Sequence, residues 1–589
     1  MIRDIHHFLE VLRREGEVVE IDTEVDPNLE IAEVHRRVIG ADGPALLFKN
    51  PKGYDMPVVT NLFGTKKRVD LAFGPKPEAF VEKAVELLHT IMPPTLGKLW
   101  SERDFFWRAT GLGNRRVGSG AVTQVVNTPP RIDKIPMLKS WIEDGGDFVT
   151  LPLVYTEHPD DGRHNLGMYR IQRHSDSTTG MHWQIGKGGG FHHHIAQNRG
   201  EDLPVTLFVG GPPALILSAI APLPENVPEL VLASLLLGKR LPICDNPAGP
   251  HPLVADCEFA FVGRVKPHDV QPEGPFGDHY GYYSLQHDYP VFHVDALCHR
   301  KGAIWPATVV GKPTQEDAVI GDYLQRLLSP LFPVVMPNVK QLWTYADTGY
   351  HALAGAVVEE RYRREAMSAA FRILGEGQLS LTKFLWVVGE PLDLEDPKAV
   401  LTYLLARFHP ETDLYVFSNL SMDTLDYSGP EVNLGSKGIM LGIGDPWREL
   451  PKTSDRGVVF CPGCLLVDGV SHGDDPGYAA KIAKDYPDWP LVIVVDDARR
   501  AASSNARFLW TVFTRFEPAA DMYSAGQRVE RHHVVYEGTI LIDARFKSTY
   551  PAELICDPDT AATVSRRWSE YFPGGGVEQG DSDAGHLDR

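Results

Sequence analysis

The stretch E-F-A-F-V-G-R-V, residues 258–265, decides the fold class of the middle of the chain. Its aromatic and β-branched residues favour a strand. Similar runs, separated by Gly and Pro, lie at 148–155, 205–209 and 291–296. Short strands at this spacing predict a β-barrel or sandwich over residues 116–325. One helix interrupts the strands, with apolar residues at helical spacing from near Pro224 to Gly238.

The sequence on both sides of this region alternates between helix and strand patterns. Before it, a helical pattern stops at Gly16, a β-rich run follows at 18–21, and a second helix opens after Pro27. After it, turns separate short apolar runs such as 352–358 from amphipathic helices. The chain therefore predicts a multi-domain α/β (α+β) protein. Its expected units are residues 1–115, 116–325, 326–449 and 450–572.

An internal repeat joins the last two of these units. Residues of the first copy recur 108 positions later: Leu385, Val387, Leu401, Arg407, Phe408, Pro410, Asp413 and Tyr415 align with Ile493, Val495, Leu509, Arg515, Phe516, Pro518, Asp521 and Tyr523. Both copies show a strand pattern, a helix pattern and then R-F-x-P-x-x-D-x-Y. The simplest interpretation is a duplicated βα unit that extends or pairs with the first sheet. The polar residues 573–589 are expected to form a disordered tail.

Composition and charge exclude several classes of function. The chain has 589 residues, of which 43% are hydrophobic and 23% charged, as in ordinary globular proteins. Its formal net charge of −20 repels phosphate backbones and anionic lipid, so we expect no nucleic-acid binding. Six cysteines are too few for a disulfide framework and indicate a reducing, cytoplasmic location. We expect neither a signal peptide nor a membrane span, because no apolar run is suitable for either.

The segment N-L-G-M-Y-R, residues 165–170, carries an amide and a cation close together. Strand alternation places Asn165 and Tyr169 on one face and Met168 and Arg170 on the other. Taken alone, this segment also fits a surface arginine.

The segment M-H-W-Q-I-G-K-G-G-G-F-H-H-H, residues 181–194, is the best local candidate for an anion site. Backbone amides at its consecutive glycines can cradle a phosphate, Lys187 adds positive charge, and Trp183 offers a flat wall for a ring system. A flexible surface turn with solvated histidines is the alternative. The glycine spacing matches neither the Walker nor the Rossmann pattern.

Acidic residues stand out at three further positions. Glu229 precedes an apolar helical run, where a carboxylate either caps the first turn or faces a cation. In P-E-G-P-F-G-D-H-Y-G-Y-Y, residues 272–283, Glu273 and Asp278 flank a tight turn beside aromatic residues. Two carboxylates held in this way can have pKa values pushed apart, which supplies an acid and a base. An acidic surface loop is the alternative.

Cys461 and Cys464 form a lone C-x-x-C motif. The nearest further metal ligand is His472, so the motif favours a structural or redox-sensitive turn over a zinc site.

These segments, in this order, resemble the UbiD family of prenylated-flavin decarboxylases. The resemblance runs from the amino terminus to about residue 445 and rests on seven collinear motifs. Besides the three segments around residues 165–170, 181–184 and 273–283 and the Glu229 helix, they are V-A-D-C-E-F-A-F-V-G at 254–263, L-T-K-F at 381–384 and G-S-K-G at 435–438. The resemblance implies an N-terminal α/β domain, a central split β-barrel that binds the flavin, and a C-terminal α/β domain that mediates dimers. The duplicated unit is similar to that of longer members, some of which act on naphthoate-type acids.

The resemblance also assigns roles to individual residues. It implies that Asn165 and Glu229 bind a divalent metal, manganese or magnesium, that bridges to the flavin phosphate, with K⁺ as a further ion. It implies cofactor contacts at Met168, Tyr169, Arg170, His182, Trp183, Gln184, Lys187, Gly188 and, for the phosphate, Lys383. The catalytic residues that it implies are Arg170, Glu273 and Asp278.

One departure from the family pattern concerns the metal. Many members have a histidine ligand where this sequence has Gly186, so His192 or His193 from the neighbouring loop, or water, would complete the site. In the second copy of the repeat, Leu491 stands at the position of Lys383, and we therefore interpret that copy as architectural.

The resemblance implies reversible, non-oxidative decarboxylation of an aromatic or α,β-unsaturated acid, with prenylated FMN accepting the electron pair left by carbon dioxide. Our hypothesis places Arg170 on the substrate carboxylate and on Glu273. Asp278 then donates the proton, with a pKa raised by a pocket that excludes water. A flavin prenyltransferase would supply the cofactor, and we expect a homodimer or higher homo-oligomer. A flavin-dependent reductase and a non-catalytic flavin-binding or assembly protein are the alternatives.

Overall fold

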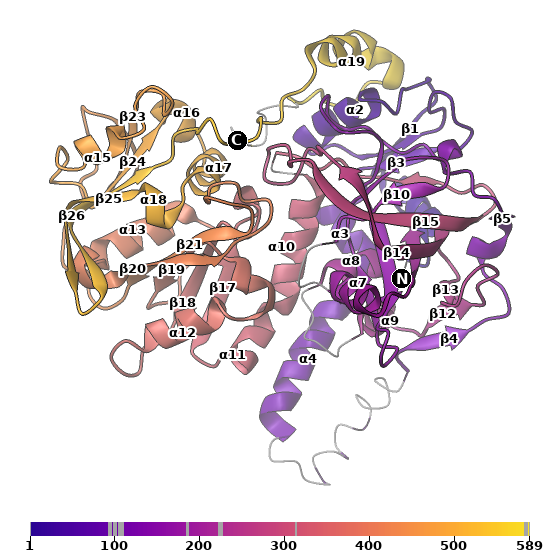
Figure 1. Cartoon of the computed structure of the whole chain (residues 1–589), viewed down its shortest axis with the longest axis horizontal. Coiled ribbons are helices and arrows are strands. Elements are labelled where there is room, and N and C mark those ends of the chain that lie inside the picture. Colours follow the sequence, from indigo (N-terminus) through magenta and orange to yellow (C-terminus); the bar gives the residue numbers. More distant parts are fainter. Residues whose placement is uncertain are drawn as a thin grey trace.

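The computed structural model shows two lobes, with α10 (Glu316–Leu328) between them (Figure 1). It describes all residues except 1, 92–96, 98–99, 101–102, 104–110, 184–187, 222–227, 313–314, 582–586 and 588–589. One lobe holds the N-terminal and central domains, and the other holds the C-terminal sheets. The expected multi-domain α/β architecture is confirmed. Within the described ranges, no helix has both the length and the hydropathy to cross a membrane.

A mixed sheet anchors the N-terminal domain. Its strands, in order, are β1 (Val18–Ile21), β2 (Ala45–Phe48), β3 (Val58–Thr60) and β16 (Trp305–Pro306). Its helices are α1 (Ile5–Glu15), α2 (Glu30–Gly40), α3 (Lys66–Phe73) and α4 (Lys76–Ile91). In α1, Phe8, Leu9 and Leu12 share one face and are fully buried. Asp4 caps this helix, and Gly16 ends it at φ 70°.

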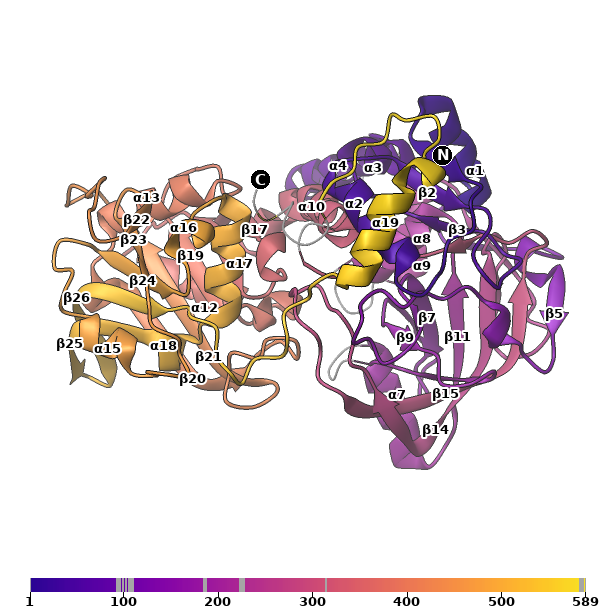
Figure 2. The ribbon, with the colours of Figure 1, turned by 90° about the horizontal axis from the view of Figure 1, so that it is seen from above.

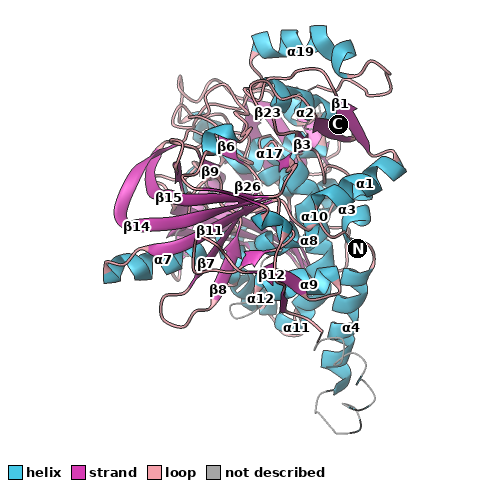
Figure 3. Ribbon diagram, turned by 90° about the vertical axis from the view of Figure 1, so that its right-hand side faces the viewer, coloured by secondary structure: helices cyan, strands magenta, loops and turns pink. Residues whose placement is uncertain are grey.

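An antiparallel sheet forms the central domain (Figure 3). Its path is β10 (Thr178–Gly180), β15 (His287–His299), β14 (Phe259–Glu273), β11 (Leu203–Val209), β7 (Pro152–Glu157) and β8 (His164–Gly167), with β5 (Val125–Asn127) on β15. Smaller sheets pair β4 (Asn114–Arg116), β12 (Leu241–Cys244) and β13 (Leu253–Val254), and β6 (Phe148–Val149) with β9 (Ile171–Gln172). Among the described residues, the main path ends at β10 and β8, and it belongs to the domain for which the resemblance implies a split β-barrel.

The helices of the central domain are α7 (Gly188–Arg199), α8 (Pro213–Ile220) and α9 (Glu229–Leu237). The helix expected from near Pro224 begins only at Glu229 in the part of the chain that the structure describes. Its N-cap is Pro228, whose ring disfavours helical geometry in the preceding residue. Its end at Gly238, with φ 59°, is as expected.

The C-terminal lobe contains two sheets with the same strand order. The first runs β17 (Val339–Thr344), β18 (Leu353–Val358), β19 (Phe384–Val388), β21 (Leu434–Gly442) and β20 (Leu414–Ser421). The second runs β22 (Val458–Cys461), β23 (Cys464–Asp468), β24 (Leu491–Val495), β26 (His533–Asp543) and β25 (Met522–Glu530). The first copy carries α11 (Phe332–Val335), α12 (Glu365–Ile373), α13 (Pro397–Arg407) and α14 (Pro410–Asp413). The second carries α15 (Tyr478–Ile482), α16 (Ala498–Ala501), α17 (Asn505–Arg515) and α18 (Pro518–Asp521).

The repeated pattern R-F-x-P-x-x-D-x-Y builds the same helix-to-strand connection in both copies. Phe408 and Phe516 are fully buried. The proline of each copy opens a one-turn helix, and the aspartate accepts a hydrogen bond from the amide four residues earlier, at 2.9 Å for Asp413 and 2.6 Å for Asp521. The pattern is therefore explained by local structure, with no catalytic role required.

The chain returns from the second sheet to the first lobe, where α19 (Pro558–Tyr571) lies beside α2 (Figure 2). Cys556 donates to Glu33 Oε2 at 2.8 Å, and Arg37 Nη2 donates to the Ala561 carbonyl at 3.0 Å. Residues 573–581, which the sequence assigns to a disordered tail, continue along α2, where the Gly580 amide donates to the Arg37 carbonyl at 3.1 Å. The segment that follows the second copy thus connects the C-terminal lobe to the first lobe.

Candidate active site

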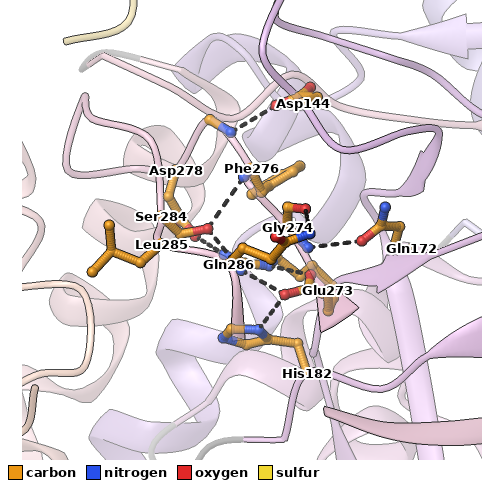
Figure 4. Close-up of polar contacts among 12 residues, drawn as sticks. Asp144, Gln172, His182, Glu273, Gly274, Phe276, Asp278, Ser284, Leu285 and Gln286 are labelled. Atoms are coloured by element: carbon orange, nitrogen blue, oxygen red, sulfur yellow. Dashed lines mark hydrogen bonds and ion pairs between the residues drawn. The ribbon is translucent and has the colours of Figure 1, made fainter. Parts of the chain in front are cut away.

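Arg170 and Glu273 form a buried, two-pronged ion pair at the end of β14. Arg170 Nε donates to Glu273 Oε1 at 2.8 Å, and Nη2 donates to Oε2 at 2.9 Å. Glu273 is fully buried, and His182 Nδ1 lies 3.1 Å from its Oε2 (Figure 4). The fold therefore brings His182 and Arg170 to Glu273, although they lie 91 and 103 positions before it in the chain.

Hydrogen bonds from two other elements hold the turn that follows β14 (Figure 4). Gly274 has φ 92°, a conformation that favours glycine, and its amide donates to Gln172 Oε1 at 2.8 Å. The Gly277 amide donates to Asp144 Oδ1 at 2.8 Å. These bonds fix the backbone immediately before Asp278.

Asp278, the third residue predicted to be catalytic, lies on the same loop. Arg170 Nη1 contacts its Oδ2, the His279 amide donates to its Oδ1 at 2.8 Å, and His279 Nδ1 lies 2.9 Å from that same oxygen. Burial opposes the charge on Asp278, but the hydrogen bonds from His279 and the charge of Arg170 outweigh burial and lower the pKa. The raised pKa expected from the sequence is therefore wrong, because two cations flank this carboxylate.

The same contacts set the protonation of the neighbouring groups. Burial would raise the pKa of Glu273, but the hydrogen bond from His182 and the charge of Arg170 outweigh burial and lower the pKa to about 2. Burial lowers the pKa of His182, which leaves a neutral imidazole. Burial would also lower the pKa of His279, but its hydrogen bond to Asp278 and the charge there raise the pKa to about 9. At neutral pH, a protonated His279 therefore lies beside the ionised Asp278.

A second group of predicted residues surrounds Asn165 on β8. Glu229, the first residue of α9, accepts a hydrogen bond from the Leu166 amide at 3.2 Å. At Gly188, the first residue of α7, an added Cβ would lie 2.0 Å from Asn165 Oδ1, so any other residue here would displace the Asn165 side chain. Asn165 Nδ2 and Trp183 Nε1 are buried and have no hydrogen-bond partner among the described residues. Unpaired donors beside a glycine-lined approach fit a bound polar group.

Met168 and Tyr169 lie between this group and Arg170 in the chain. Tyr169 belongs to the same buried core as Trp183, and Met168 packs, partly buried, against a neighbouring core. The two predicted contacts therefore connect the Asn165 group to the Arg170 group.

His192, the predicted third metal ligand, lies on α7 near the Asn165 strand. Its Nδ1 is 2.9 Å from Thr156 Oγ1, and Thr156 is the cross-strand partner of Asn165. Among the described residues, no hydrogen bond joins His192 to Asn165 or Glu229. In the same part of the chain, no group of three His, Cys, Asp or Glu side chains lies close enough together to hold a metal ion. Three predicted positions lie outside the described residues: Gln184, Gly186 and Lys187.

Lys383 lies in the other lobe, where it is almost fully buried. Its Nζ is 2.8 Å from Asp426 Oδ2 and 3.0 Å from Ser428 Oγ. The ring of Phe516, from the second copy, lies 5.5 Å from the same ammonium group. These partners all belong to the C-terminal lobe, so the phosphate contact of Lys383 stays a prediction.

Three residues of the site were not singled out from the sequence. His279 directly follows the predicted acid, and this adjacency was the available signal. Ser284 accepts a hydrogen bond from Arg170 Nη2 at 2.9 Å, and Tyr427 accepts one from the Leu285 amide at 3.0 Å. Ser284 and Tyr427 are 114 and 142 residues from these partners, so no local pattern marks them.

Three family models match successive parts of the chain. The N-terminal domain model of 3-octaprenyl-4-hydroxybenzoate carboxy-lyase matches residues 9–88, its Rift-related domain model matches 115–313, and its C-terminal domain model matches 318–442. Together they cover more than half of the chain and end before the second copy of the repeat.

Individual relatives extend these matches. A 4-hydroxybenzoate decarboxylase subunit from Chlamydia pneumoniae is 47% identical over 577 residues, covering 97% of this chain and 98% of its own length. The closed form of the vanillic acid decarboxylase of Sedimentibacter hydroxybenzoicus has a TM-score of 0.67 at 23% identity, covering 77% of this chain and 96% of its own. The UbiD-class enzyme HmfF of Pelotomaculum thermopropionicum, in complex with FMN, has a TM-score of 0.62 at 23% identity, covering 74% and 94%. The similarity to the chlamydial protein therefore includes the second copy.

Proposed function

Because the chain belongs to the UbiD family of carboxy-lyases, we propose that it decarboxylates an aromatic or α,β-unsaturated carboxylic acid with prenylated FMN and a divalent metal. The observation that carries this proposal is the buried Arg170 fork, which holds Glu273 and Asp278 in one cluster. A guanidinium flanked by two carboxylates, with a neutral and a charged imidazole beside them, can orient an anionic substrate and transfer a proton.

Arg170 and Glu273 position the substrate in this proposal. Arg170 contributes the positive charge that an incoming carboxylate needs, and Glu273 keeps the guanidinium plane fixed. Phe276 lies 4.9 Å from the guanidinium carbon, measured to its ring centre, and adds an apolar surface beside the charge. This surface suits an unsaturated or aromatic acid.

Asp278 and His279 transfer the proton. The proton on His279 Nδ1 first moves to Asp278 Oδ1, 2.9 Å away. After carbon dioxide leaves, the Asp278 carboxyl delivers this proton to the substrate carbon as its O–H bond breaks and a C–H bond forms, and solvent then reprotonates the imidazole. A substrate carboxylate next to Arg170 would offset the charge that lowers the pKa of Asp278, so substrate binding itself favours the protonated acid.

The Asn165 group fits the cofactor. Asn165 and Glu229 would hold the metal, manganese or magnesium, with oxygen ligands of the kind that such ions prefer, and Gly188 and Trp183 would contact the flavin and its phosphate. When bound, prenylated FMN accepts the electron pair released from the carboxylate carbon. His192 as third ligand, K⁺ as a further ion, Lys383 as phosphate contact, a flavin prenyltransferase as supplier and a homo-oligomeric state remain part of this proposal.

The test is a screen of aromatic and alkenyl acids for carbon dioxide release by protein co-expressed with a flavin prenyltransferase. We expect turnover by the wild type and at least about a 100-fold loss in Asp278→Asn, with the flavin still bound. Asp269→Asn, on the long β14–β15 hairpin, is the matched control. Full activity of Asp278→Asn would refute the assignment of the acid.

A further inference from the structure

The second copy of the repeat packs directly on the loop that carries Asp278. Trp510, in α17, donates from Nε1 to the Tyr280 carbonyl at 2.9 Å. Its indole ring stacks on Tyr282, with centroids 5.4 Å apart and an interplanar angle of 12°. All three side chains are 1–2% exposed. A residue 230 positions further along the chain therefore covers the loop.

The returning segment, residues 546–557, adds backbone bonds to the same loop. The Tyr283 amide donates to the Ala552 carbonyl at 3.0 Å, and the Leu554 amide donates to the Gly281 carbonyl at 3.0 Å. These two bonds pair the loop with the returning segment in an antiparallel bridge. The loop is thus held by main-chain contacts as well as by the indole.

Charged side chains add two further contacts around the loop. Glu553 pairs with Lys312, with Oε1 and Nζ 2.7 Å apart. Arg515, five residues after Trp510, donates from Nε to the Tyr282 hydroxyl at 3.1 Å. Each contact joins the second copy or the returning segment to the first lobe or its loop.

These contacts reach Asp278 through the backbone of its own turn. The Asp278 amide donates to the Tyr282 carbonyl at 3.1 Å, and the Gly281 amide donates to the Asp278 carbonyl at 2.9 Å. Gly281 has φ 84°, and a Cβ there would lie 2.8 Å from Trp510 Nε1, so the indole leaves no room for another residue. A displacement of Tyr282 therefore displaces Asp278.

We propose that Trp510 is a positioning residue for Asp278, and that the second copy holds the loop of Asp278 in place at the active site. The proposal rests on the decarboxylase function above, because Asp278 needs a defined position only if it transfers a proton. It gives the second copy a role that does not depend on a phosphate-binding lysine, which is Leu491 in that copy. Proton transfer is sensitive to displacements of about 1 Å, so a loosened loop slows turnover.

The test compares Trp510→Phe with Trp489→Phe in the full-length, flavin-loaded protein. Phenylalanine keeps an aromatic ring at 510 but removes the hydrogen bond to the loop. Trp489 is 8% exposed and packs in a separate core of the second copy, which makes it a matched control. Amide hydrogen exchange of the peptide 276–284 reports the loop directly, and kcat, KM and their pH dependence report its consequence.

We expect faster exchange in Trp510→Phe, a kcat about 10- to 100-fold lower, and an unchanged KM. The basic limb of its pH profile should move downward, because His279 loses part of its contact with Asp278, which raises the pKa of His279. Trp489→Phe should show none of these changes. Exchange and kcat equal to those of Trp489→Phe would overturn the proposal, as would fast exchange with undiminished kcat.

A second variant keeps the test decisive if Trp510→Phe does not fold. Glu553→Gln removes the pair with Lys312 at a partly exposed position and should accelerate exchange of the same peptide. Unchanged exchange in this variant would count against the proposal. If the wild type releases no carbon dioxide from any acid, the proposed decarboxylase function is refuted. The exchange comparison still decides whether the second copy holds the loop.

Discussion

His279 approaches one oxygen of the Asp278 carboxylate with two donors, its backbone amide at 2.8 Å and its imidazole Nδ1 at 2.9 Å. The other oxygen of the carboxylate contacts Arg170. With a pKa of about 9 for His279 and a lowered pKa for Asp278, the pair holds one transferable proton between Nδ1 and Oδ1. Proton transfer between these atoms requires no movement of the loop.

Replacing His279 with Asn should remove the basic limb of the pH profile. In the wild type, we expect kcat/KM to fall above about pH 9, where His279 loses its proton. Asparagine retains a side-chain donor but does not titrate, so the variant should be about 100-fold slower and show no limb there. The check is kcat/KM from pH 6 to 10. A limb near pH 9 that persists in the variant would assign it to another group.

The difference in thermal stability between the wild type and His279→Asn should depend on pH. The pKa of His279 is raised in the folded state, so its stabilising effect is complete below about 6.5, its ordinary value, and is lost as pH rises through about 9. The thermal midpoint of the wild type should therefore exceed that of His279→Asn at pH 6 and approach it by pH 10. Scans at four pH values measure this. A constant difference would show that His279 is not charged in the folded protein.

Replacing Arg170 with Met should destabilise the fold strongly. The change leaves Glu273 buried without its cation, which costs about 3–5 kcal/mol. Adding Glu273→Gln removes the uncompensated charge and should restore part of the loss. Arg131→Met is the control, because Arg131 is exposed and pairs with Asp133 at the surface. Urea unfolding of the wild type, the two single variants and the double variant measures the free energy of unfolding. Equal losses of stability in Arg170→Met and Arg131→Met would contradict a buried charge pair.

The strands and helices could be predicted from local patterns because their signals lie within a few residues. Residues 259–265 of the run at 258–265 lie in β14, and the apolar spacing near the amino terminus forms α1. The duplicated pattern at an offset of 108 also corresponds to two sheets of equal strand order. The start of α9 was misplaced because Val227, before Pro228, continues the helical spacing of Leu230 and Val231.

The site itself could be predicted only through the family resemblance. Arg170 is 103 residues from Glu273, and no periodicity links positions so distant in the chain. The pKa of Asp278 was predicted in the wrong direction because burial is visible in an apolar sequence, whereas the two cations that contact the carboxylate depend on the folded loop. Trp510 is separated from the loop residue that it contacts by 230 positions in the sequence, and this contact depends on how the lobes pack.

Replacing Asn165 with Ala should reduce cofactor loading without unfolding the protein. The change removes a buried amide whose nitrogen has no partner of hydrogen-bond geometry among the described residues and otherwise acts on the buried Tyr169 hydroxyl, so little internal hydrogen bonding is lost. We expect metal affinity at least about tenfold lower and little bound flavin after co-expression with a prenyltransferase. Flavin absorbance and metal analysis measure this, with the exposed Asn198→Ala as control. Normal loading in Asn165→Ala would exclude it from the cofactor site.

Lys383 allows a structural role to be separated from a cofactor role. Its Nζ lies 2.8 Å from Asp426 Oδ2, and the two side chains are 1% and 2% exposed. Replacing Lys383 with Met therefore leaves a buried carboxylate and should cost about 3–5 kcal/mol in the free energy of unfolding, as measured in urea. The double variant Lys383→Met, Asp426→Asn removes both charges and should regain most of that stability.

The restored stability of this double variant makes its flavin content informative. If Lys383 also contacts the flavin phosphate, a lost charged hydrogen bond should weaken flavin binding about tenfold although the protein is stable. Asp426→Asn alone, which retains the lysine, is the matched control and should bind flavin normally. We expect the double variant to bind FMN about tenfold more weakly than Asp426→Asn, as measured by titration of the apoprotein with FMN. Equal flavin affinity in the double variant and the wild type would limit Lys383 to the ion pair with Asp426, and the phosphate would then need another cation.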